Sequence, residues 1–396
     1  MTGTRTALGL AQAGARVVLL EAKSIGWGAS GRSGGQCNPI WRKTPDQLRA
    51  LLGAECGDRL VETTLGAADA LFEDIKRYGI ACDAEQTGWV QAAHCASARA
   101  DLEALAAAWN AEGGQIRRLD AAQTYAATGS QAYDFALFHP SGGHVQPLSL
   151  TRGFACKAIA LGAELYEHSP ATAATRCADG GWRVATGQGS VSAKQVILTT
   201  NAYTDDLWPK LRQTLYPMVS IALATQPLSD NLRKSILPNA VTISDTRRAI
   251  YFARYDRDGR LIFGCVGSHD TDPAALGGLW RLKRGLRHVF PQLEDARIET
   301  SWAGRIGVTP HMMPYLHAPE PGVLAALGFS GRGIAMTSVM ARALVHKALG
   351  GRDDALPFPV SPVNALPFHA LSTASLPLGA PAMALRDRLD TLFTRR

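Results

Sequence analysis

The stretch "TALGLAQAGARVVLLEA" near the start of the chain constrains the fold more than any other feature. Small and apolar residues at 4–13 predict a helix that ends at Gly14, and the apolar run at 17–20 predicts a strand followed directly by Glu21. This is the second half of a nucleotide-binding unit, in which the carboxylate accepts hydrogen bonds from ribose hydroxyls. We therefore expect a nucleotide-binding domain whose first strand and glycine-rich turn precede Met1.

Two glycine-rich segments support the same expectation. The first, "SIGWGASGRSGGQ", holds five glycines, but it also holds Trp27, Arg32 and Gln36, which a flexible linker does not need. The second, "ALGFSGRGIAMTSVMARAL", places a glycine-rich turn between an apolar strand and a helix. Both patterns predict backbone amides that approach a phosphate or the edge of a planar ring.

The order of the patterns predicts two interleaved domains. Pieces of α/β pattern occur at 1–36, 142–205 and 300–350, and hairpin-rich pieces lie between them. A chain of 396 residues also exceeds one compact core. Further expected elements are two helices within 45–79, helices at 97–114, 147–161 and 276–290, a strand at 164–167, a hairpin that turns at Asp258 and Gly259, and a fully buried central strand, "QVILTT".

Composition excludes several classes of protein. With 46% hydrophobic and 19% charged residues, and without eighteen consecutive uncharged apolar residues, we expect a cytoplasmic protein with no membrane span. Seven scattered cysteines without a Cys-x-x-Cys pair predict reduced thiols and no metal site. The net charge of +7 suits an anionic ligand but is too mild to indicate nucleic-acid binding.

Together these segments resemble a known family. "GARVVLLEA", "GWGASGRSGGQ", "GGHVQPLSLTRG", "QVILTTNAY", "YDRDGRLIFG", "WAGRIGVTPHMMPYLH" and "GFSGRGIAMTSVMAR" are similar to the FAD-dependent D-amino-acid oxidase superfamily, most closely its gamma-glutamylputrescine oxidase-like branch. The resemblance implies an α/β two-domain flavoprotein with a Rossmann-like FAD-binding domain, its first strand and part of its glycine loop missing, and an antiparallel-sheet substrate domain. The implied boundaries are 1–80, 142–210 and 302–352 for the FAD domain, 81–141 and 211–301 for the substrate domain, and 353–396 for a proline-rich tail with a short helix.

The resemblance also implies which residues hold FAD. Gly3 would let the first helix pack closely on the sheet, Glu21 would bind the adenosine ribose, and Ala171 would lie near the adenine. The first glycine-rich segment would line the pyrophosphate and the flavin ring, and the second would face the pyrimidine end of the flavin. The residues concerned in these two segments are Ala29, Ser30, Gly31, Arg32, Gly34, Gly35, Gln36, Gly328, Ser330, Gly331, Arg332, Gly333 and Ile334.

Two departures from the family pattern refine the expectation. Some relatives attach FAD through a cysteine near "GRIGVTPHMMPY", but no cysteine lies between 266 and 396, so we expect noncovalent FAD. Relatives that oxidise amino acids place arginines in this segment, and Arg305 alone remains there, which disfavours a simple amino acid as substrate. His144 and His311 are candidate proton acceptors, although each is equally compatible with a loop histidine that bonds to the backbone.

The expected activity is the oxidation of a primary or secondary amine, gamma-glutamylputrescine-like or amino-acid-related, to an imine and then an aldehyde, with oxygen reduced to hydrogen peroxide. Two alternatives stay open. One is a flavin dehydrogenase that uses another electron acceptor, and the other is a truncated, non-catalytic remnant that no longer binds FAD.

Overall fold

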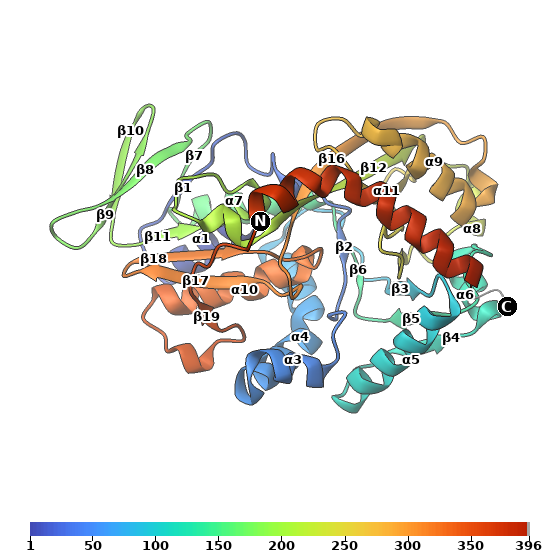
Figure 1. The fold of residues 1–396 in the computed structure, drawn as a ribbon. Helices are drawn as coiled ribbons and strands as arrows, with labels where there is room; N and C mark the ends of the chain where they lie inside the picture. The colour runs from blue at the N-terminus through green and yellow to red at the C-terminus, as the bar shows by residue number, and fades with distance from the viewer. Residues whose placement is uncertain (394–396) are drawn as a thin grey trace.

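The computed structural model describes residues 1–393, which form a mixed α/β structure with two domains (Figure 1). One domain, at the left of Figure 1, combines short parallel strands with helices that cover them. The other, at the right, is built on one large sheet. The last three residues of the predicted tail, 394–396, lie outside the described residues.

The parallel strands of the first domain fall into two separate sheets. Strand β1 (Val18–Leu20) pairs in parallel with β7 (Glu164–Tyr166), and β11 (Val196–Leu198) pairs in parallel with β18 (Val323–Leu327). The second sheet continues through β17 (Tyr315–Glu320) to β19 (Val360–Ser361). Within the described chain β1 and β11 share no hydrogen bonds, and both border a cavity.

The expectation of a fully buried central strand at "QVILTT" is wrong. Strand β11 has one partner strand, and two of its three residues are only partly buried. The physical reason is that its second edge faces the cavity instead of another strand.

Four helices cover this domain through small and apolar faces. Helix α1 (Thr2–Gln12) contacts α7 (Pro147–Ala160) and α10 (Gly333–Ala348), and α10 contacts α4 (Ala54–Tyr78). Their shared core holds fully buried side chains from each helix, and burying one such side chain contributes about 1.5–3 kcal/mol. These side chains are Leu8, Leu71, Phe154 and Met340.

Local signals explain where the helices begin and end. Helix α3 (Pro45–Leu52) starts with a capping box in which Thr44 and Gln47 satisfy each other's backbone amides, and Pro45 occupies its first turn. Helix α4 ends at Gly79 in the left-handed conformation. The remaining helices are α2 (Ala29–Arg32), α5 (Ala96–Ala111), α6 (Ala121–Thr128), α8 (Asp230–Ser235), α9 (Gly278–Val289) and α11 (His369–Phe393).

The second domain contains eight strands in the order β16-β12-β15-β14-β13-β3-β5-β4. Neighbours are antiparallel except β3 and β13, which run parallel, so the expected antiparallel sheet contains one parallel pair. Its strands are β3 (Trp89–Ala92), β4 (Arg117–Leu119), β5 (Ala136–His139), β12 (Tyr216–Thr225), β13 (Thr242–Asp245), β14 (Phe252–Tyr255), β15 (Leu261–Gly267) and β16 (Ile298–Val308).

Smaller sheets complete the fold. The strands β8 (Ala171–Arg176), β9 (Trp182–Thr186) and β10 (Gly189–Ala193) form an antiparallel meander, and β2 (Gln36–Cys37) pairs with β6 (Gly143–His144).

The C-terminal tail differs from its expected form. Helix α11 has 25 residues, longer than the short helix expected, with Pro377 and Pro381 inside it. It runs along the large sheet and contacts β12 and β15 (Figure 1). None of the helices formed by residues 1–393 combines the length and the hydrophobicity needed to cross a membrane.

Candidate cofactor and active site

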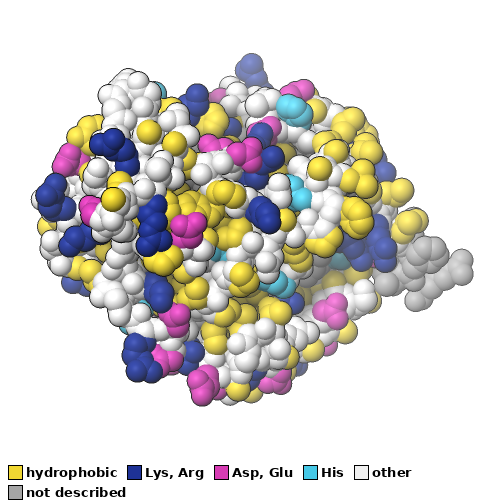
Figure 2. All heavy atoms as spheres, turned by 60° about the vertical axis from the view of Figure 1, so that its left-hand side comes forward, with side chains coloured by type: hydrophobic (Ala, Val, Ile, Leu, Met, Phe, Trp, Pro, Cys, Tyr) yellow, Lys and Arg dark blue, Asp and Glu magenta, His cyan; other side chains and the backbone are white. Residues whose placement is uncertain are grey.

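A cavity of about 1620 Å³ lies where the two domains meet. Its lining comes from α1, β1, β11 and both glycine-rich segments on one side, and from β12, β14 and β16 of the large sheet on the other. Figure 2 shows apolar side chains recessed in the middle of one face of the molecule, with Lys and Arg side chains beside them.

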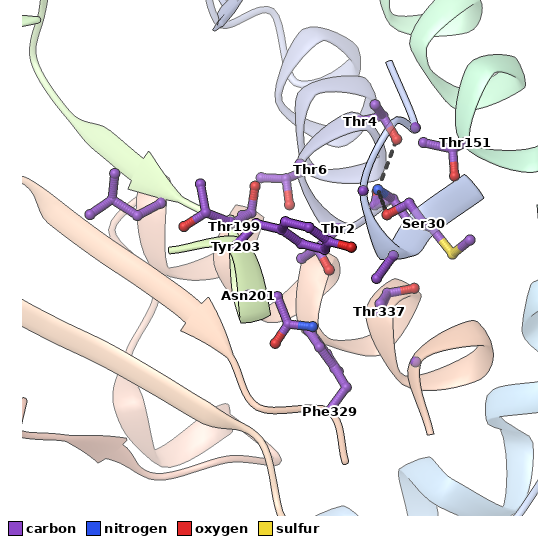
Figure 3. Close-up of a pocket in the computed structure, with 18 of the residues that line it drawn as sticks. Thr2, Thr4, Thr6, Ser30, Thr151, Thr199, Asn201, Tyr203, Phe329 and Thr337 are labelled. Atoms are coloured by element: carbon purple, nitrogen blue, oxygen red, sulfur yellow. Dashed lines mark hydrogen bonds between the residues drawn. The ribbon is translucent and has the colours of Figure 1, made fainter. Parts of the chain in front are cut away.

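The first part of the cavity lies beside α1 and β1. Gly3 packs so closely that an added Cβ would lie 2.6 Å from Thr199 Oγ1, which explains why a glycine is needed there. Glu21 and Ala171 both line the cavity, and Glu21 Oε1 accepts a hydrogen bond of 2.9 Å from the Lys23 amide. Hydroxyl-bearing side chains surround the same space in Figure 3: Thr2, Thr4, Thr6, Ser30, Thr151, Thr199 and Thr337.

The first glycine-rich segment borders the middle of the cavity. Its backbone is held by the large sheet, because Gln36 Nε2 donates to the carbonyls of Ile243 and Ala253 at 2.8 and 2.9 Å. Gly35 has a φ of +74°, and an added Cβ would lie 2.2 Å from the Val145 carbonyl oxygen, so no other residue fits. Trp302 Nε1 donates to the carbonyl of Arg32 at 2.9 Å and thus anchors this segment.

The second glycine-rich segment forms the turn before α10. Its start is tied to the short 3-10 helix after β11, because Gly328 N donates to Asn201 Oδ1 at 2.8 Å, and to β16, because Ser330 N donates to the Gly307 carbonyl at 2.9 Å. Gly331 has a φ of +82°, and no protein atom lies within 4 Å of the place where its Cβ would be. The turn therefore presents bare backbone to the cavity.

Most of the predicted FAD residues meet in this one cavity. Gly31 and Gly328 do not line it, because each packs against protein: an added Cβ would meet the Gly26 carbonyl oxygen at 2.2 Å and Thr309 Cγ2 at 2.4 Å, respectively. The predicted residues that line the cavity are Gly3, Glu21, Ala29, Ser30, Arg32, Gly34, Gly35, Gln36, Ala171, Ser330, Gly331, Arg332, Gly333 and Ile334.

Of the three predicted catalytic residues, only Arg305 lines the cavity. Its Nε lies 2.6 Å from Asp270 Oδ2, so its charge already has a partner. His144 is 4% exposed and lies behind the first glycine-rich segment, where burial and the nearby Arg254 lower its pKa to about 4. The His311 ring packs edge-on against Tyr315, and burial together with Lys43 lowers the pKa of His311.

Residues that the sequence analysis did not single out also shape the site. Asn201 has a positive φ and connects β11 to the second glycine-rich turn through the bond to Gly328. Tyr203 Oη accepts a hydrogen bond of 3.1 Å from the Arg305 amide, and its ring packs edge-on against Trp27. Only their position directly after "QVILTT" hinted at a role, since loops after parallel strands commonly form sites.

Comparison with known proteins decides the family. Residues 1–347 match the DAO family, described as FAD dependent oxidoreductase. The chain belongs to this family of FAD-dependent oxidoreductases. It is 32% identical to gamma-glutamylputrescine oxidoreductase of Escherichia coli over 98% of this chain and 91% of that protein. It is 31% identical to a probable oxidoreductase, OrdL, of Haemophilus influenzae over 89% of this chain and 82% of that protein.

Two solved structures agree with the fold. Glycine oxidase from Geobacillus kaustophilus superimposes with a TM-score of 0.75 at 20% identity, covering 91% of this chain and 95% of the other. L-proline dehydrogenase from P. horikoshii gives a TM-score of 0.75 at 20% identity, covering 91% and 96%. The resemblance to this flavoprotein family and the two-domain α/β fold are therefore confirmed.

The residues present fit the FAD that the family implies. No side chain caps the N-terminus of α1 or of α10, so free backbone amides of both helices are available near the cavity, as an anionic group requires. The hydroxyl of Thr6 is buried without a hydrogen-bond partner beside the same space. The bare backbone at Gly331 leaves room for a flat ring.

One side-chain cluster outside this cavity has metal-ligand chemistry. His94, Asp387 and Asp390 bring their ligand atoms within 4.8 Å of one another. Arg248 forms ion pairs with both carboxylates, so its single positive charge offsets part of their negative charge.

Proposed function

We propose that this chain oxidises a primary or secondary amine, gamma-glutamylputrescine-like or amino-acid-related, to an imine that water hydrolyses to an aldehyde. We propose oxygen as the electron acceptor and hydrogen peroxide as the second product. The similarity to gamma-glutamylputrescine oxidoreductase over 98% of this chain supports this choice of substrate class. Arg305 is already paired with Asp270, which disfavours the binding of a simple amino acid through its carboxylate at that position.

The observation that carries the proposal is that one cavity has two chemically different walls. Backbone amides and hydroxyls lie on the side of the first domain, whereas the large sheet supplies a group of apolar side chains on the opposite side, together with Ser220 and Arg305. When bound, FAD supplies the two-electron acceptor that takes hydride from the carbon next to the amine. The apolar wall consists of Met218, Val219, Ile250, Phe252, Val266 and Ile306.

An apolar surface of this kind favours an uncharged amine over a charged ammonium. No histidine of residues 1–393 lines the cavity, so the role of His144 or His311 as proton acceptor stays a prediction. We propose that the amine reacts as the free base and that the protein chiefly supplies position and an apolar surface. Below the pKa of the substrate ammonium, kcat/KM should then rise about tenfold per pH unit.

The test is purification followed by a peroxide-release screen. We expect a yellow protein with flavin absorbance near roughly 450 nm, and acid precipitation should release all of that flavin, since we propose noncovalent binding. The screen compares polyamines, their gamma-glutamyl conjugates, sarcosine and D-amino acids.

Each alternative has its own readout in this test. If the same amines reduce a dye but release no peroxide, the protein is a dehydrogenase and not an oxidase. A folded protein that stays colourless with excess FAD would favour the non-catalytic remnant.

A further inference from the structure

The outer face of the C-terminal helix α11 is apolar and exposed. Four large side chains on it are between 43 and 72% exposed, although leucine is ordinarily a core residue. Single exposed leucines are common, but a contiguous apolar surface indicates contact with another molecule. These side chains are Leu371, Leu378, Leu385 and Leu389.

The opposite face of α11 already packs on the rest of the chain. Ala380 and Asp387 are buried on that face, and the helix contacts β12, β15 and the 3-10 helix η3 (Ala275–Gly277). In Figure 1, α11 lies on the outside of the large sheet, and no other element of residues 1–393 covers it in this view. The exposed leucines therefore point away from the sheet that α11 covers.

The exposed face has the spacing of a helix that pairs with another helix. Exposed uncharged side chains recur on it after four and three residues in alternation. This heptad pattern places side chains along one seam, where each inserts between side chains of a facing helix. The six seam positions are Leu371, Ser375, Leu378, Ala382, Leu385 and Leu389.

The order of large and small side chains along this seam suits a second copy of the same helix in the antiparallel direction. A pair centred between Leu378 and Ala382 places each of these residues opposite the other one in the second copy. The next layer on either side then pairs Ser375 with Leu385. A large side chain thus meets a small one in each of the central layers, which allows the two helices to pack closely.

Charge favours the antiparallel direction over the parallel one. Residues 369–385 contain no Asp, Glu, Lys or Arg, whereas Arg386 and Arg388 are exposed beside the C-terminal end of the seam. In a parallel pair, these arginines would face the same arginines of the second copy, and like charges repel. In an antiparallel pair, they lie beside the uncharged half of the other helix.

We propose that the exposed face of α11 is the interface of a homodimer, in which two copies of this chain pair through antiparallel α11 helices around a twofold axis. The same surface serves both copies, as an interface of this symmetry requires. Met383 of α11 lines the cavity, and Asp387 binds the amides of Arg248 and Ala249. The dimer contact thus lies on the helix that shapes one rim of the cavity, and it is independent of the proposed amine oxidation.

The first test is the mass of the full chain in sedimentation equilibrium, measured from roughly 1 to 50 μM because dimer formation depends on concentration. We expect twice the chain mass of 42.2 kDa. Leu378→Lys brings two charges into the centre of the pair and should raise the dissociation constant of the dimer at least about 100-fold. Ser375→Lys should do the same without removing an apolar side chain, which covers the case that Leu378→Lys fails to fold.

The matched control is Leu161→Lys, which makes the same change at another exposed leucine, at the end of α7. It should leave the dissociation constant of the dimer unchanged. A chain that stays monomeric over this whole concentration range would overturn the interface. A dimer that survives both α11 substitutions, or one that Leu161→Lys weakens equally, would overturn it as well.

Cysteine crosslinking tests the direction of the two helices. Under mild oxidation, a mixture of Ser375→Cys and Leu385→Cys chains should form a disulfide-linked dimer. Each variant alone should not, because identical positions lie at least about 15 Å apart in the antiparallel pair, too far for a disulfide. The wild type, with its seven native cysteines, gives the background. A disulfide-linked dimer of Ser375→Cys alone would show a parallel pair and overturn the proposal.

Lipid vesicles test the other surface that could cover an apolar helix face. Vesicles of phosphatidylglycerol and phosphatidylcholine should not retain the wild-type chain in a flotation experiment. If the chain is monomeric in solution and binds these vesicles, and Leu378→Lys abolishes the binding, the face belongs to a membrane contact and the dimer is overturned.

Discussion

At the scale of single residues, one buried carboxylate connects three helices. Asp74 in α4 is 6% exposed and accepts hydrogen bonds from Arg5 of α1 at 2.9 Å and from Arg342 of α10 at 3.0 Å. The Arg5 guanidinium also lies over the rings of Tyr78 and Phe154. Because α1 and α10 both begin at the cavity, this network ties together the two helices whose first turns would face FAD.

Replacement of Asp74 by asparagine should therefore destabilise the protein strongly. The change leaves the buried Arg5 guanidinium, and the exposed one of Arg342, without their negatively charged partner, and breaking such a buried pair costs about 3–5 kcal/mol. The free energy of unfolding in urea measures the loss. Glu73→Gln removes the same charge from the exposed neighbour and should change that free energy by no more than about 0.5 kcal/mol. Equal losses for both variants would contradict the structural role of Asp74.

At the scale of elements, the C-terminal helix helps to shape the cavity. Asp387 of α11 is 4% exposed and accepts hydrogen bonds from the amides of Arg248 and Ala249, both at 3.0 Å. Met383 on the same helix and Ile250 after the bonded turn both line the cavity. The helix thus holds one rim of the cavity through Asp387 and through the ion pair between Asp390 and the Arg248 side chain.

Asp387→Ala should loosen α11 without unfolding the sheet. Loss of these bonds costs about 1.5–3 kcal/mol, because charged acceptors make the stronger hydrogen bonds. Amide hydrogen exchange in α11 should then accelerate roughly 10- to 100-fold, while exchange in β12 stays unchanged. Arg388→Gln, an exposed change on the same helix, serves as the control. If the amide hydrogen-exchange rate of α11 is the same in Asp387→Ala as in the wild type, Asp387 does not anchor this helix.

Patterns among neighbouring residues predicted most of the helices and strands, but they did not predict features that depend on contacts between distant parts of the sequence. The helix expected at 147–161 is α7, since Pro147 and the apolar period act within a few residues. The position of β11 at a sheet edge depends on strands far away in the sequence. Its apolar pattern therefore predicted a fully buried strand where the structure has a partly buried one. The prolines in α11 suggested irregular structure, but packing along the large sheet overrides that local preference.

The candidate site divides in the same way. The location of Glu21 and of most of the glycines along the cavity could be predicted, because it follows from their position relative to one strand or helix. The placement of His144 behind the cavity depends on how the two domains join. No local pattern encodes such contacts.

At the scale of the whole molecule, buried histidines make stability depend on pH. Burial and nearby arginines lower the pKa of His139 to about 3 and that of His144 to about 4. Below about pH 6.5 the unfolded chain therefore binds protons that the folded protein does not. Stability should fall as the pH drops through this range and should level off above it.

Between pH 6.5 and 5, each of these two histidines should remove about 2 kcal/mol of unfolding free energy. His139→Phe keeps the ring contact with Trp89, whose centre is 4.5 Å away, and should remove the roughly 2 kcal/mol that His139 contributes to this pH dependence. His269→Gln, at an exposed site, should leave it unchanged. Urea unfolding at pH 5 and pH 7 measures both variants, and a pH dependence that survives His139→Phe in full would contradict this account.

FAD should link the two domains, because the cavity that fits it takes its walls from both. At 100 times its dissociation constant, FAD stabilises the folded state by about 2.7 kcal/mol, which raises the unfolding temperature by about 3–5 °C. Adenosine diphosphate meets only the part of the cavity near Glu21 and should give a smaller rise at the same concentration. Glu21→Gln should reduce the shift caused by both ligands, whereas riboflavin, which lacks the adenosine, should stabilise the variant and the wild type equally. Equal shifts with FAD in the wild type and in Glu21→Gln would place the adenosine elsewhere in the cavity.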